Sequence, residues 1–479
     1  MRRRLRRSGR WQLLIAAGGA GVLLAVTSCT SGTTGSSTTG PAPGASPALP
    51  GGVAPPATAA QANWPTYDRT AGRSGVSVSS PAPGNVRRSW TATVDGAVYA
   101  QPLVVGSEVI IATENDSVYA LNAASGKVNW SRHLASPVTG GLPCGNIHPS
   151  GITGTPVADV ATGDLWVVTF TEDPAYRHTL WELNLATGRV VRQRPIDVPG
   201  SDPRAEQERG ALTLLGSRVY VPFGGLTGDC SDYKGREVGA PLSGSGKLVS
   251  FSTDNQRQAG IWAPAGETVS GDSMYVATGN GMPLDKIDDS DSVLRLGPEL
   301  AVQGIFTPAN WEPLSADDQD LGSTAPALLP GGLLFEVGKE GVGYVLNGAK
   351  LGGTGGQLDS AKVCEGGFGG DAVDGSTVVF SCYDSLRAIQ VVPGAHGAAP
   401  RISTRWSVTG VAAGPPIIAG GVAWDVDRKG TVDGYRLSDG TRVFSAPTAP
   451  TVSDFPSLSA SGSRLVVPEG DEVVSYVGI

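Results

Sequence analysis

A segment rich in carboxylates lies near the middle of the chain. Residues 278–283 read Thr-Gly-Asn-Gly-Met-Pro, and Asp288, Asp289 and Asp291 follow a few positions later. Carboxylate oxygens are the hard ligands that Ca²⁺ prefers, so these aspartates could add oxygen ligands to a bound Ca²⁺. The other interpretation is a turn, in which Gly and Asn supply positive φ and the aspartates are solvated.

Other reactive side chains give weaker signals. His148 could bind a ligand, although a rim loop held by a disulfide is the other interpretation, and Glu206, Glu208 and Arg209 precede a strand and are expected to be solvated. The chain has no Cys-x-x-Cys pattern and only four His, which argues against a metal cluster, an attached haem or a histidine-based zinc site. No phosphate-binding loop or serine nucleophile motif is convincing.

Four cysteines remain beyond the N-terminal region, at positions 144, 230, 364 and 382. An even set in an exported chain suggests disulfides, and four cysteines allow three pairings. We favour Cys364 with Cys382, placed at the start and on the second strand of one repeat unit. Cys144 would then pair with Cys230, both in long loops after neighbouring units.

The elements that position these residues form a repeat. Each unit begins with a lead-in that ends in Pro, followed by an apolar strand, a second strand and a turn, and the unit recurs about every 40 to 60 residues. Six lead-ins show this directly: Gln101-Pro102, Thr155-Pro156, Ala263-Pro264, Ala325-Pro326, Pro415-Pro416 and Phe455-Pro456. Counting the strands that follow gives eight units. Such units stack against one another, and a ring closes the stack.

The strand pattern predicts an all-β, eight-bladed β-propeller with four-stranded blades. Strands rich in Val, Ile, Tyr and Trp, bounded by Gly or polar clusters, support this assignment. In the third unit the pattern places the second strand at residues 219–221 and the third at 248–251. The last unit ends at Ile479 with three strands, and residues 88–94 form a spare strand upstream. Pairing the two would close the ring and remove an exposed edge.

Long insertions mark the end of the propeller where ligands would bind. They cover residues 137–152, 224–245, 280–290 and 309–323. Propellers bind ligands at the mouth of the central channel, and long loops are often functional. Ligand binding and simple decoration of the rim both stay open.

The N-terminus carries an export signal. Six arginines lie within the first ten residues and an apolar stretch, too short and Gly-rich for a good membrane span, follows at residues 11–26. Val26-Thr27-Ser28-Cys29 fits the lipobox of bacterial lipoproteins, in which the Cys becomes lipidated. We expect residues 1–28 to be a lipoprotein signal peptide and Cys29 the lipidation site, with a plain secretory signal as the alternative.

The residues after Cys29 form a tether. Residues 29–62 consist mainly of Ser, Thr, Gly, Pro and Ala without charge, a composition that cannot form a core and is expected to be disordered. Residues 63–479 then form the propeller. The protein is therefore expected to be exported and anchored by lipid to the cell membrane, on its extracytoplasmic face.

The charge excludes some partners. The net charge is −8, and removal of residues 1–28, which hold six Arg and no acid, takes it to −14. An acidic domain is a poor candidate for nucleic acid or for anionic lipid, so membrane contact would come from the anchor. We expect a monomer that meets an envelope protein or a small-molecule ligand at the propeller rim.

The repeats resemble those of a known family. Residues 117–130, Ser-Val-Tyr-Ala-Leu-Asn-Ala-Ala-Ser-Gly-Lys-Val-Asn-Trp, and Gly279-Asn280-Gly281 are similar to repeats of pyrroloquinoline-quinone (PQQ)-like β-propellers. This family includes quinoprotein alcohol dehydrogenases, polyvinyl-alcohol dehydrogenases and non-catalytic scaffold lipoproteins of bacterial envelopes. The resemblance covers roughly residues 63–479. One fold hosts many functions, so it indicates the fold more than an activity.

The resemblance implies roles for two asparagines. In the dehydrogenases a Thr-Gly-Asn segment supplies an Asn oxygen to the calcium that holds PQQ, and Asn280 is the matching position, with Asp288, Asp289 and Asp291 as further metal ligands. Thr307-Pro308-Ala309-Asn310-Trp311 is similar to the segment that carries the catalytic Asp. The nearest match here is Asn310, whose amide cannot act as a general base.

Two functions follow from the resemblance. Asp317, Asp318 or Asp320 could replace the missing base, but the pattern selects none, and the adjacent Cys-Cys pair of many of these enzymes is absent. These departures favour a non-catalytic binding or scaffold module without an assigned cofactor. The alternative is a PQQ- and calcium-dependent alcohol or polyvinyl-alcohol dehydrogenase.

Overall fold

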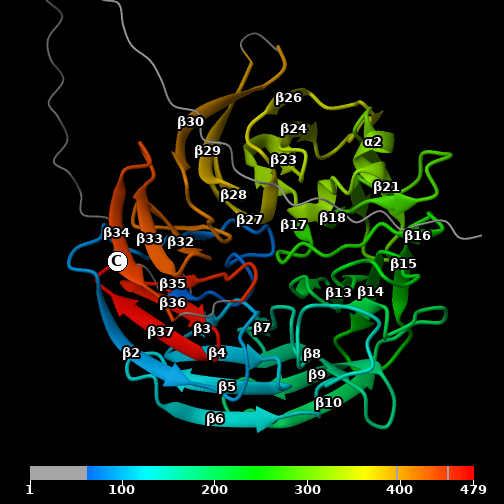
Figure 1. Cartoon of the computed structure of the whole chain (residues 1–479). Helices are drawn as coiled ribbons and strands as arrows, with labels where there is room; N and C mark the ends of the chain where they lie inside the picture. Colours follow the sequence, from blue (N-terminus) through cyan, green and yellow to red (C-terminus); the bar gives the residue numbers. More distant parts are fainter. Residues whose placement is uncertain (1–61, 395–397, 450–452) are drawn as a thin grey trace, which may run out of the picture. The chain divides into compact units, whose positions relative to one another are not determined.

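Short β-strands are the main regular elements of the structure (Figure 1). This computed structural model describes residues 62–394, 398–449 and 453–479. The expected signal peptide, Cys29 and nearly all of the tether lie outside these residues. Within the described ranges, no helix combines the length and the hydrophobicity that a membrane span requires.

The strands form eight sheets with four antiparallel strands each, which we call blades 1 to 8 in chain order and which surround a central axis (Figure 1). The inner strands are β3 (Leu103–Val105), β7 (Val157–Asp159), β12 (Thr213–Leu215), β17 (Thr268–Ser270), β22 (Ala327–Leu329), β27 (Gly367–Asp374), β31 (Ile417–Ala419) and β35 (Ser459–Ser461). The second strands are β4 (Glu108–Thr113), β8 (Asp164–Thr171), β13 (Arg218–Gly225), β18 (Ser273–Ala277), β23 (Leu333–Val337), β28 (Thr377–Cys382), β32 (Val422–Asp427) and β36 (Arg464–Glu469).

The outer half of each blade completes the sheet. The third strands are β5 (Ser117–Asn122), β9 (Arg177–Asn184), β14 (Arg236–Pro241), β20 (Val293–Leu296), β24 (Val342–Asn347), β29 (Ser385–Val392), β33 (Thr431–Arg436) and β37 (Glu472–Val477). The outer strands are β6 (Val128–His133), β10 (Val190–Pro195), β15 (Val249–Ser252), β21 (Val302–Thr307), β26 (Asp359–Lys362), β30 (Arg401–Thr409), β34 (Arg442–Pro447) and β2 (Arg87–Thr93).

The minor elements lie between or beside the blades. They are β1 (Val76–Ser77), β11 (Glu206–Gln207), β16 (Arg257–Gln258), β19 (Gly281–Met282), β25 (Gly353–Thr354), α2 (Trp311–Ala316), η1 (Leu321–Ser323) and η2 (Pro330–Gly332). Of the loops expected from the sequence, residues 280–290 therefore contain β19, and residues 309–323 contain α2 and η1.

The N-terminal strand closes the ring. Strand β2 pairs with β37, with Thr91 opposite Val474 and Arg87 opposite Val477, so the outer strand of blade 8 comes from the start of the propeller. This pairing confirms the predicted closure. It leaves blade 8 with the same four strands as the other blades.

Blade 3 differs from the sequence prediction. Of residues 248–251, expected to form its third strand, residues 249–251 belong to the outer strand β15. The third strand is β14, inside the segment expected to be a loop (224–245). The prediction was wrong because β14 begins with Arg236 and Glu237, which hide the strand pattern. Arg236 is buried, and its Nε donates to Glu206 at 2.7 Å, so the charge is neutralised inside the protein.

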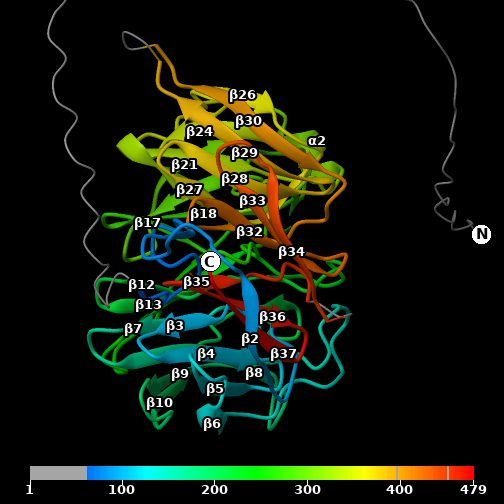
Figure 2. The same cartoon turned by 90° about the vertical axis from the view of Figure 1, so that its left-hand side faces the viewer.

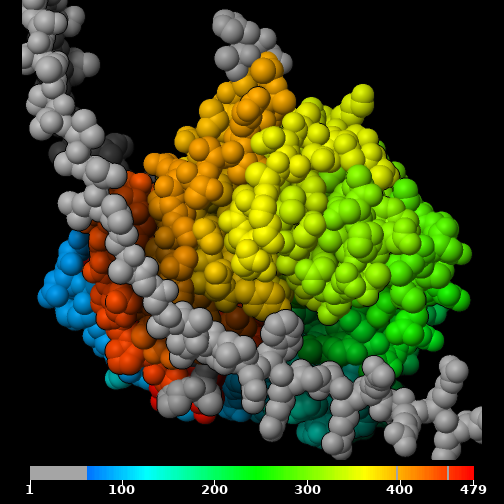
Figure 3. Space-filling model, turned by 45° about the horizontal axis from the view of Figure 1, so that its top comes forward, coloured from blue at the N-terminus to red at the C-terminus, as the bar shows by residue number. Residues whose placement is uncertain are grey.

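The blades pack face to face through apolar side chains. Ile110, Leu165 and Val167 share one cluster between blades 1 and 2, and similar clusters lie between the other blades. Second strands such as β28 and β32 are buried on both faces, so apolar and polar residues do not alternate strictly along them. Figure 3 shows the outer surfaces of consecutive blades side by side, in green, yellow and orange.

Tryptophans on outer strands fasten neighbouring blades. Trp130 on β6 donates its indole N–H to the carbonyl of Leu185 in blade 2 at 3.1 Å, and its ring would lie 2.3 Å from a Cβ added at Gly188. The glycine is therefore needed for the ring to dock. Equivalent contacts join Trp90 to Ala123 O and Trp406 to Leu437 O, both at 2.8 Å.

The two ends of the blades differ. At one end, which we call the turn face, tight turns join inner and second strands with glycine at positive φ, as at Gly106 (59°) and Gly216 (60°). At the other end, the loop face, the chain makes its long connections between blades. Because loops carry most binding residues, the loop face is where a site is expected.

Residues 63–80 cross the centre of the ring, where Figures 1 and 2 show this segment in blue. Its backbone bonds to inner strands in chain order: Trp64 with Val104, Pro65 with Ala158, Ala71 with Val269, Ser74 with Val373 and Gly75 with Ile418. Arg73 is fully enclosed and donates to Thr213 Oγ1 at 2.6 Å and to Glu267 O at 2.9 Å. The segment thereby ties together blades that lie on opposite sides of the axis.

Candidate functional site

A row of aromatic side chains crosses the axis near the loop face. Trp262 lies in the lead-in to blade 4 and Phe455 in the lead-in to blade 8, yet their ring centroids are 6.5 Å apart. Phe455 stacks on Phe368 of blade 6 at 6.1 Å, and Phe368 meets Tyr383 edge-on at 4.4 Å. Residues from blades 4, 6 and 8 can meet only at the centre of the ring. The row therefore lies over the centre of the ring on the loop face, and we call this place the mouth.

Lys339 places a positive charge beside this row. It follows β23, and its Nζ lies 5.8 Å from the ring centre of Trp262, within reach of a cation–π contact. The same Nζ pairs with Asp320 at 2.5 Å and with Asp318 at 2.9 Å. Burial opposes the charged form, but these two carboxylates prevail and raise the pKa of Lys339 above its ordinary value. Lys339 therefore stays protonated.

Asp320 joins Lys339 to the carboxylate-rich segment. Its Oδ1 accepts the backbone N–H of Asn280 at 2.6 Å, and the Asp320 side chain is almost wholly buried. A Cβ added at Gly279 would lie 2.4 Å from that oxygen and 3.2 Å from Trp262 Nε1. Glycine is thus required where the backbone of blade 4 approaches the mouth.

The three aspartates expected to bind calcium have separate protein partners. Asp288 Oδ1 accepts from the N–H and hydroxyl of Ser290 (2.8 and 2.6 Å), and Asp289 accepts the N–H of Asp254 at 2.8 Å. Asp291 holds Ser315 Oγ at 2.5 Å and the N–H of Leu321 at 3.0 Å. Across the part of the chain that the structure describes, no three His, Cys, Asp or Glu side chains are grouped to hold a metal ion. Calcium binding by Asn280 and these aspartates stays a prediction.

Asp291 is buried next to the mouth, and its pKa is raised above the ordinary value for an aspartate. Burial, followed by repulsion from Asp320, raises its pKa to about 7. Its hydrogen bonds oppose this shift but do not cancel it. The group therefore titrates near neutral pH, although it faces protein atoms and not solvent.

Asn310, the match to a catalytic Asp, lies outside the row. It precedes α2 and its Nδ2 donates to Glu340 Oε1 at 2.9 Å. Of the three aspartates that could replace it, the structure places Asp320 against Asn280 and Lys339, while Asp318 takes part through Lys339. The sequence could not select Asp320, because the selection depends on how the lead-in to blade 5 folds against blade 4.

A second charged group lies beside the mouth. Arg209, expected to be solvated, is buried, and its guanidinium lies 5.8 Å from the ring centre of Tyr99 and donates to Asp454 O at 3.2 Å. Glu208 is buried too and accepts the N–H of Gly154 at 3.1 Å. The expectation of solvated residues was wrong here because the strand they precede is an inner one, next to the axis.

Glu114 borders the same group on blade 1. Its Oε2 accepts the N–H of Gly151 at 2.7 Å and the hydroxyl of Thr153 at 3.1 Å. Burial raises its pKa to about 7, against the effect of these hydrogen bonds and of Arg209. Carboxyl groups with a pKa near 7 therefore lie on both sides of the mouth, Asp291 in blade 4 and Glu114 in blade 1.

The mouth residues carry a sequence signal that is visible in hindsight. Phe455 directly precedes the Pro of its lead-in, and Trp262 is one residue further away. Gln101, before another of these prolines, also faces the axis, where it accepts from Trp64 Nε1 and from the N–H of Asp68 at 2.8 Å. Positions before the lead-in prolines therefore point inward. Lys339 and Phe368 have no such signal.

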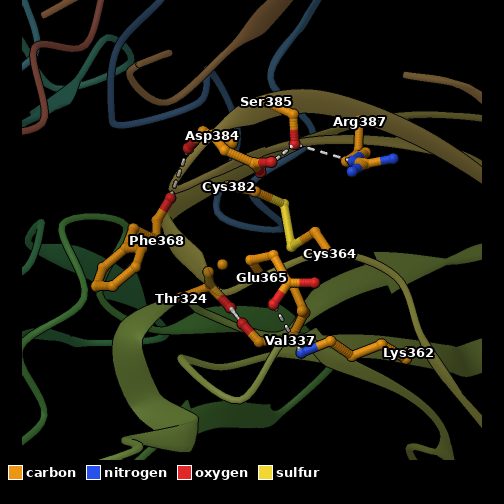
Figure 4. Close-up of a disulfide and its surroundings, with 12 residues drawn as sticks. Thr324, Val337, Lys362, Cys364, Glu365, Phe368, Cys382, Asp384, Ser385 and Arg387 are labelled. Atoms are coloured by element: carbon orange, nitrogen blue, oxygen red, sulfur yellow. Dashed lines mark hydrogen bonds and ion pairs between the residues drawn. A yellow bond between two sulfur atoms is a disulfide. The ribbon is translucent and has the colours of Figure 1, made fainter. Parts of the chain in front are cut away.

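Both disulfides have the pairing that the sequence favours. Cys144 pairs with Cys230, and Cys364 with Cys382. Cys364 follows β26 of blade 5, whereas Cys382 ends β28 of blade 6, so this bond joins two blades. The sequence pattern placed both cysteines in one blade, and that part of the prediction was wrong. Figure 4 shows this bond and the nearby Phe368, whose ring points away from the two sulfur atoms.

The other bond fixes the rim. Cys144 lies in the loop between blades 1 and 2, and Cys230 lies between β13 and β14 of blade 3. His148 is exposed in the same rim loop. Asn146 links that loop to the mouth by donating to Asp454 Oδ2 at 2.8 Å.

Comparisons with known proteins agree with this architecture. Residues 67–289 match the family model described as outer membrane protein assembly factor BamB. The chain is 24% identical over 237 residues to a polyvinylalcohol dehydrogenase of Sphingopyxis sp. (strain 113P3). The match covers 44% of this chain and 33% of that protein, so the chain spans about a third of the length of this curated relative.

Solved structures share the fold at low identity. Quinohemoprotein alcohol dehydrogenase ADHIIG from Pseudomonas putida HK5 superposes with a TM-score of 0.67 at 14% identity, covering 88% of this chain and 81% of that one. BamB from Moraxella catarrhalis gives 0.57 at 13% identity, covering 82% and 100%. The chain is an eight-bladed β-propeller whose fold is similar both to a quinohemoprotein alcohol dehydrogenase and to BamB.

Proposed function

We propose that this protein is an exported, lipid-anchored envelope protein whose propeller binds a partner or ligand at the loop-face mouth without turning it over. The observation that carries the proposal is the Asp320–Lys339 ion pair at the mouth. The acid best placed to act as a base is held by an ammonium group and by the Asn280 N–H. Burial raises the pKa of Asp320 in spite of the ion pair, but both of its oxygens are engaged by protein donors, so neither is free to accept a substrate proton.

The mouth residues, as they stand, do not fit a quinone held by a metal. Such a site needs several oxygen ligands around a metal, flat groups on the two faces of the ring and a free base. Trp262 supplies one flat group, but Phe455 packs against it. The carboxylates of Asp288, Asp289 and Asp291 are bonded to separate protein groups.

The aromatic row suits recognition of a partner. Tyr383 is 56% exposed, and Phe368 and Phe455 continue the aromatic surface inward. Aromatic side chains dominate the energy of many binding surfaces, because they bury a large area at a small entropic cost. Similarity to BamB over residues 67–289 supports a protein partner.

A photocrosslinking amino acid tests where the partner binds. Placed at Tyr383 in the full chain and exported in its host, it should capture a discrete species on irradiation. Placed at Thr162, in a turn on the opposite face, it should capture none. Equal capture at both positions, or at neither, would refute binding at the mouth.

The lipid anchor is tested separately. The supporting observation is Val26-Thr27-Ser28-Cys29 followed by an uncharged tether. Cys29→Ala should release the protein from membranes or stall its processing, as fractionation would show. Unchanged retention would refute the anchor without affecting the mouth.

A PQQ- and calcium-dependent dehydrogenase is the second candidate. Two observations favour it. The segments that contain Asn280 and Asp320 meet next to Trp262 and Lys339. In addition, the matched relative is a polyvinylalcohol dehydrogenase. The purified protein should be titrated with PQQ and Ca²⁺ while tryptophan fluorescence and dye-linked oxidation of alcohols and polyvinyl alcohol are followed. We expect weak or no binding and no turnover. Stoichiometric uptake with calcium-dependent dye reduction, lost in Asn280→Ala, would establish the dehydrogenase instead.

A further inference from the structure

The outer strands of five consecutive blades carry arginine and no acid. These strands are β30, β34, β2, β6 and β10, which Figure 1 shows along the left and lower perimeter. Their arginines, which we call the arginine arc, are Arg401, Arg405, Arg442, Arg87, Arg88, Arg132, Arg192 and Arg194. None of the five strands contains Asp or Glu. The arc therefore lies on one contiguous side of a protein whose net charge is negative.

Protein carboxylates neutralise only part of the arc. Arg88 pairs with Glu469 at 3.6 Å, Arg442 with Asp433 at 3.8 Å, and Arg192 with Glu182. Arg132 donates to Gly188 O at 2.9 Å and Arg405 to Thr377 Oγ1 at 2.9 Å, contacts that orient the guanidinium and leave its charge uncompensated. Six of the eight arginines are exposed.

Protection of sheet edges does not account for this distribution. Charged side chains on edge strands discourage pairing between molecules. That need applies equally to the outer strands of the three remaining blades, yet β15 (Val-Ser-Phe-Ser) and β21 (Val-Gln-Gly-Ile-Phe-Thr) have no charged residue. Strand β26 has one acid and one base. The arginines are concentrated on one side and are not spread around the ring.

We propose that the arginine arc binds a flexible linear polymer of repeating phosphate groups. Arginine binds phosphate through paired N–H donors. The arc is convex, so a flat membrane would touch only part of it, whereas a flexible chain follows it from blade 6 round to blade 2. Single-stranded nucleic acid would also need exposed aromatic rings for stacking. The tryptophans of these strands, such as Trp130 and Trp406, are engaged between blades.

Linear polyphosphate is the probe for this surface. The full exported protein should bind long polyphosphate more tightly than short chains and lose affinity steeply with salt, as counterion release requires. The arc variant Arg87→Gln, Arg132→Gln, Arg401→Gln and Arg405→Gln should bind at least about tenfold more weakly, with a shallower salt dependence. None of these four arginines has a carboxylate partner in the described structure, so the variant is expected to fold; circular dichroism and thermal melting verify it.

A charge-matched control separates the arc from net charge. Lys247→Gln, Lys286→Gln, Lys350→Gln and Lys362→Gln remove four exposed charges from blades 3 to 5 and should change affinity less than about twofold. An equal loss in the control would overturn the proposal. So would a failure to bind long polyphosphate, or tighter binding to anionic vesicles or to oligo-dT of equal charge. Binding at the loop-face mouth is independent of all these outcomes.

Discussion

The backbone N–H of Asn280 donates to Oδ1 of Asp320 over 2.6 Å, although the two residues are 40 positions apart. The bond joins the loop of blade 4 to the lead-in of blade 5 at the mouth. Its length depends on Gly279, because a Cβ there would meet Asp320 at 2.4 Å and Trp262 at 3.2 Å.

Gly279→Ala should therefore damage the mouth. We expect a loss of about 1–3 kcal/mol in the free energy of unfolding, typical of an overpacked buried site, together with a change in tryptophan fluorescence as Trp262 moves. Urea unfolding measures the first effect. Gly140→Ala is the control, since nothing lies within 4 Å of its added Cβ, and it should stay within about 0.5 kcal/mol of the parent. Identical behaviour of the two variants would contradict the close approach.

Buried acids should make the protein less stable at alkaline pH. Burial raises the pKa of five interior carboxyls, to about 7 for Glu114 and Asp291, about 8 for Asp68 and Glu336, and about 9 for Asp116. In each case the folded pKa exceeds the unfolded one, so the folded state binds more protons. The stabilisation is complete below about pH 4 and is lost as the pH rises through about 7 to 9. Thermal melting between pH 5 and 9 should show this fall.

Glu336→Gln isolates one of these groups. Glu336 Oε1 accepts the hydroxyl of Thr324 at 2.6 Å, and a glutamine carbonyl can accept the same bond without titrating. Between pH 6 and 9, the free energy of unfolding should fall by roughly 1–3 kcal/mol less in the variant than in the parent. Glu312→Gln, which changes an exposed acid on α2, is the control. Parallel pH profiles for parent and Glu336→Gln would show that Glu336 is ionised in the folded protein.

The fold could be predicted because the blade pattern repeats along the sequence. The residues of the mouth could not be predicted, because they do not repeat from blade to blade. The Pro lead-ins, the glycine turns and strands such as residues 117–122 recur often enough to give eight blades and the closing strand. The third strand of blade 3 was not predicted, because the charged Arg236 and Glu237 at its start are typical of a loop. Only the structure shows that Glu206 neutralises Arg236 inside the protein. The residues of the mouth were not predicted, because Trp262, Lys339 and Asp320 lie in different loops of the chain. The closed ring of blades brings these loops together.

The docked tryptophans should contribute strongly to the stability of the ring. Trp130→Ala removes the indole that bonds to Leu185 O and packs on Gly188, and we expect a loss of about 3 kcal/mol. Ser131→Ala changes an exposed neighbour on the same strand and should cost less than about 0.5 kcal/mol. Denaturant unfolding compares them. A Trp130→Ala protein as stable as Ser131→Ala would mean that blades 1 and 2 are held by strand packing alone.

The two disulfides should stabilise the protein to different extents. Cys144 and Cys230 are 86 residues apart, and Cys364 and Cys382 are 18 apart. Loop-closure entropy favours the longer loop, with about 3 kcal/mol for a short loop and about 4 to 5 kcal/mol for a long one. Replacing each pair with serine and measuring urea unfolding should give losses in that order. The reverse order would show that the bond between blades 5 and 6 holds native packing in addition to restricting the unfolded chain.

The pairing of β2 with β37 also sets a constraint on the order of synthesis. Strand β2 emerges long before its partner, because β37 (Glu472–Val477) lies at the opposite end of the propeller sequence. During translation and export β2 therefore has no native neighbour, and an unpaired strand tends to pair wrongly. Its two leading arginines, Arg87 and Arg88, oppose such pairing. We expect the nascent protein to need a holdase chaperone until β37 has been made, and chains truncated before β37 to be degraded.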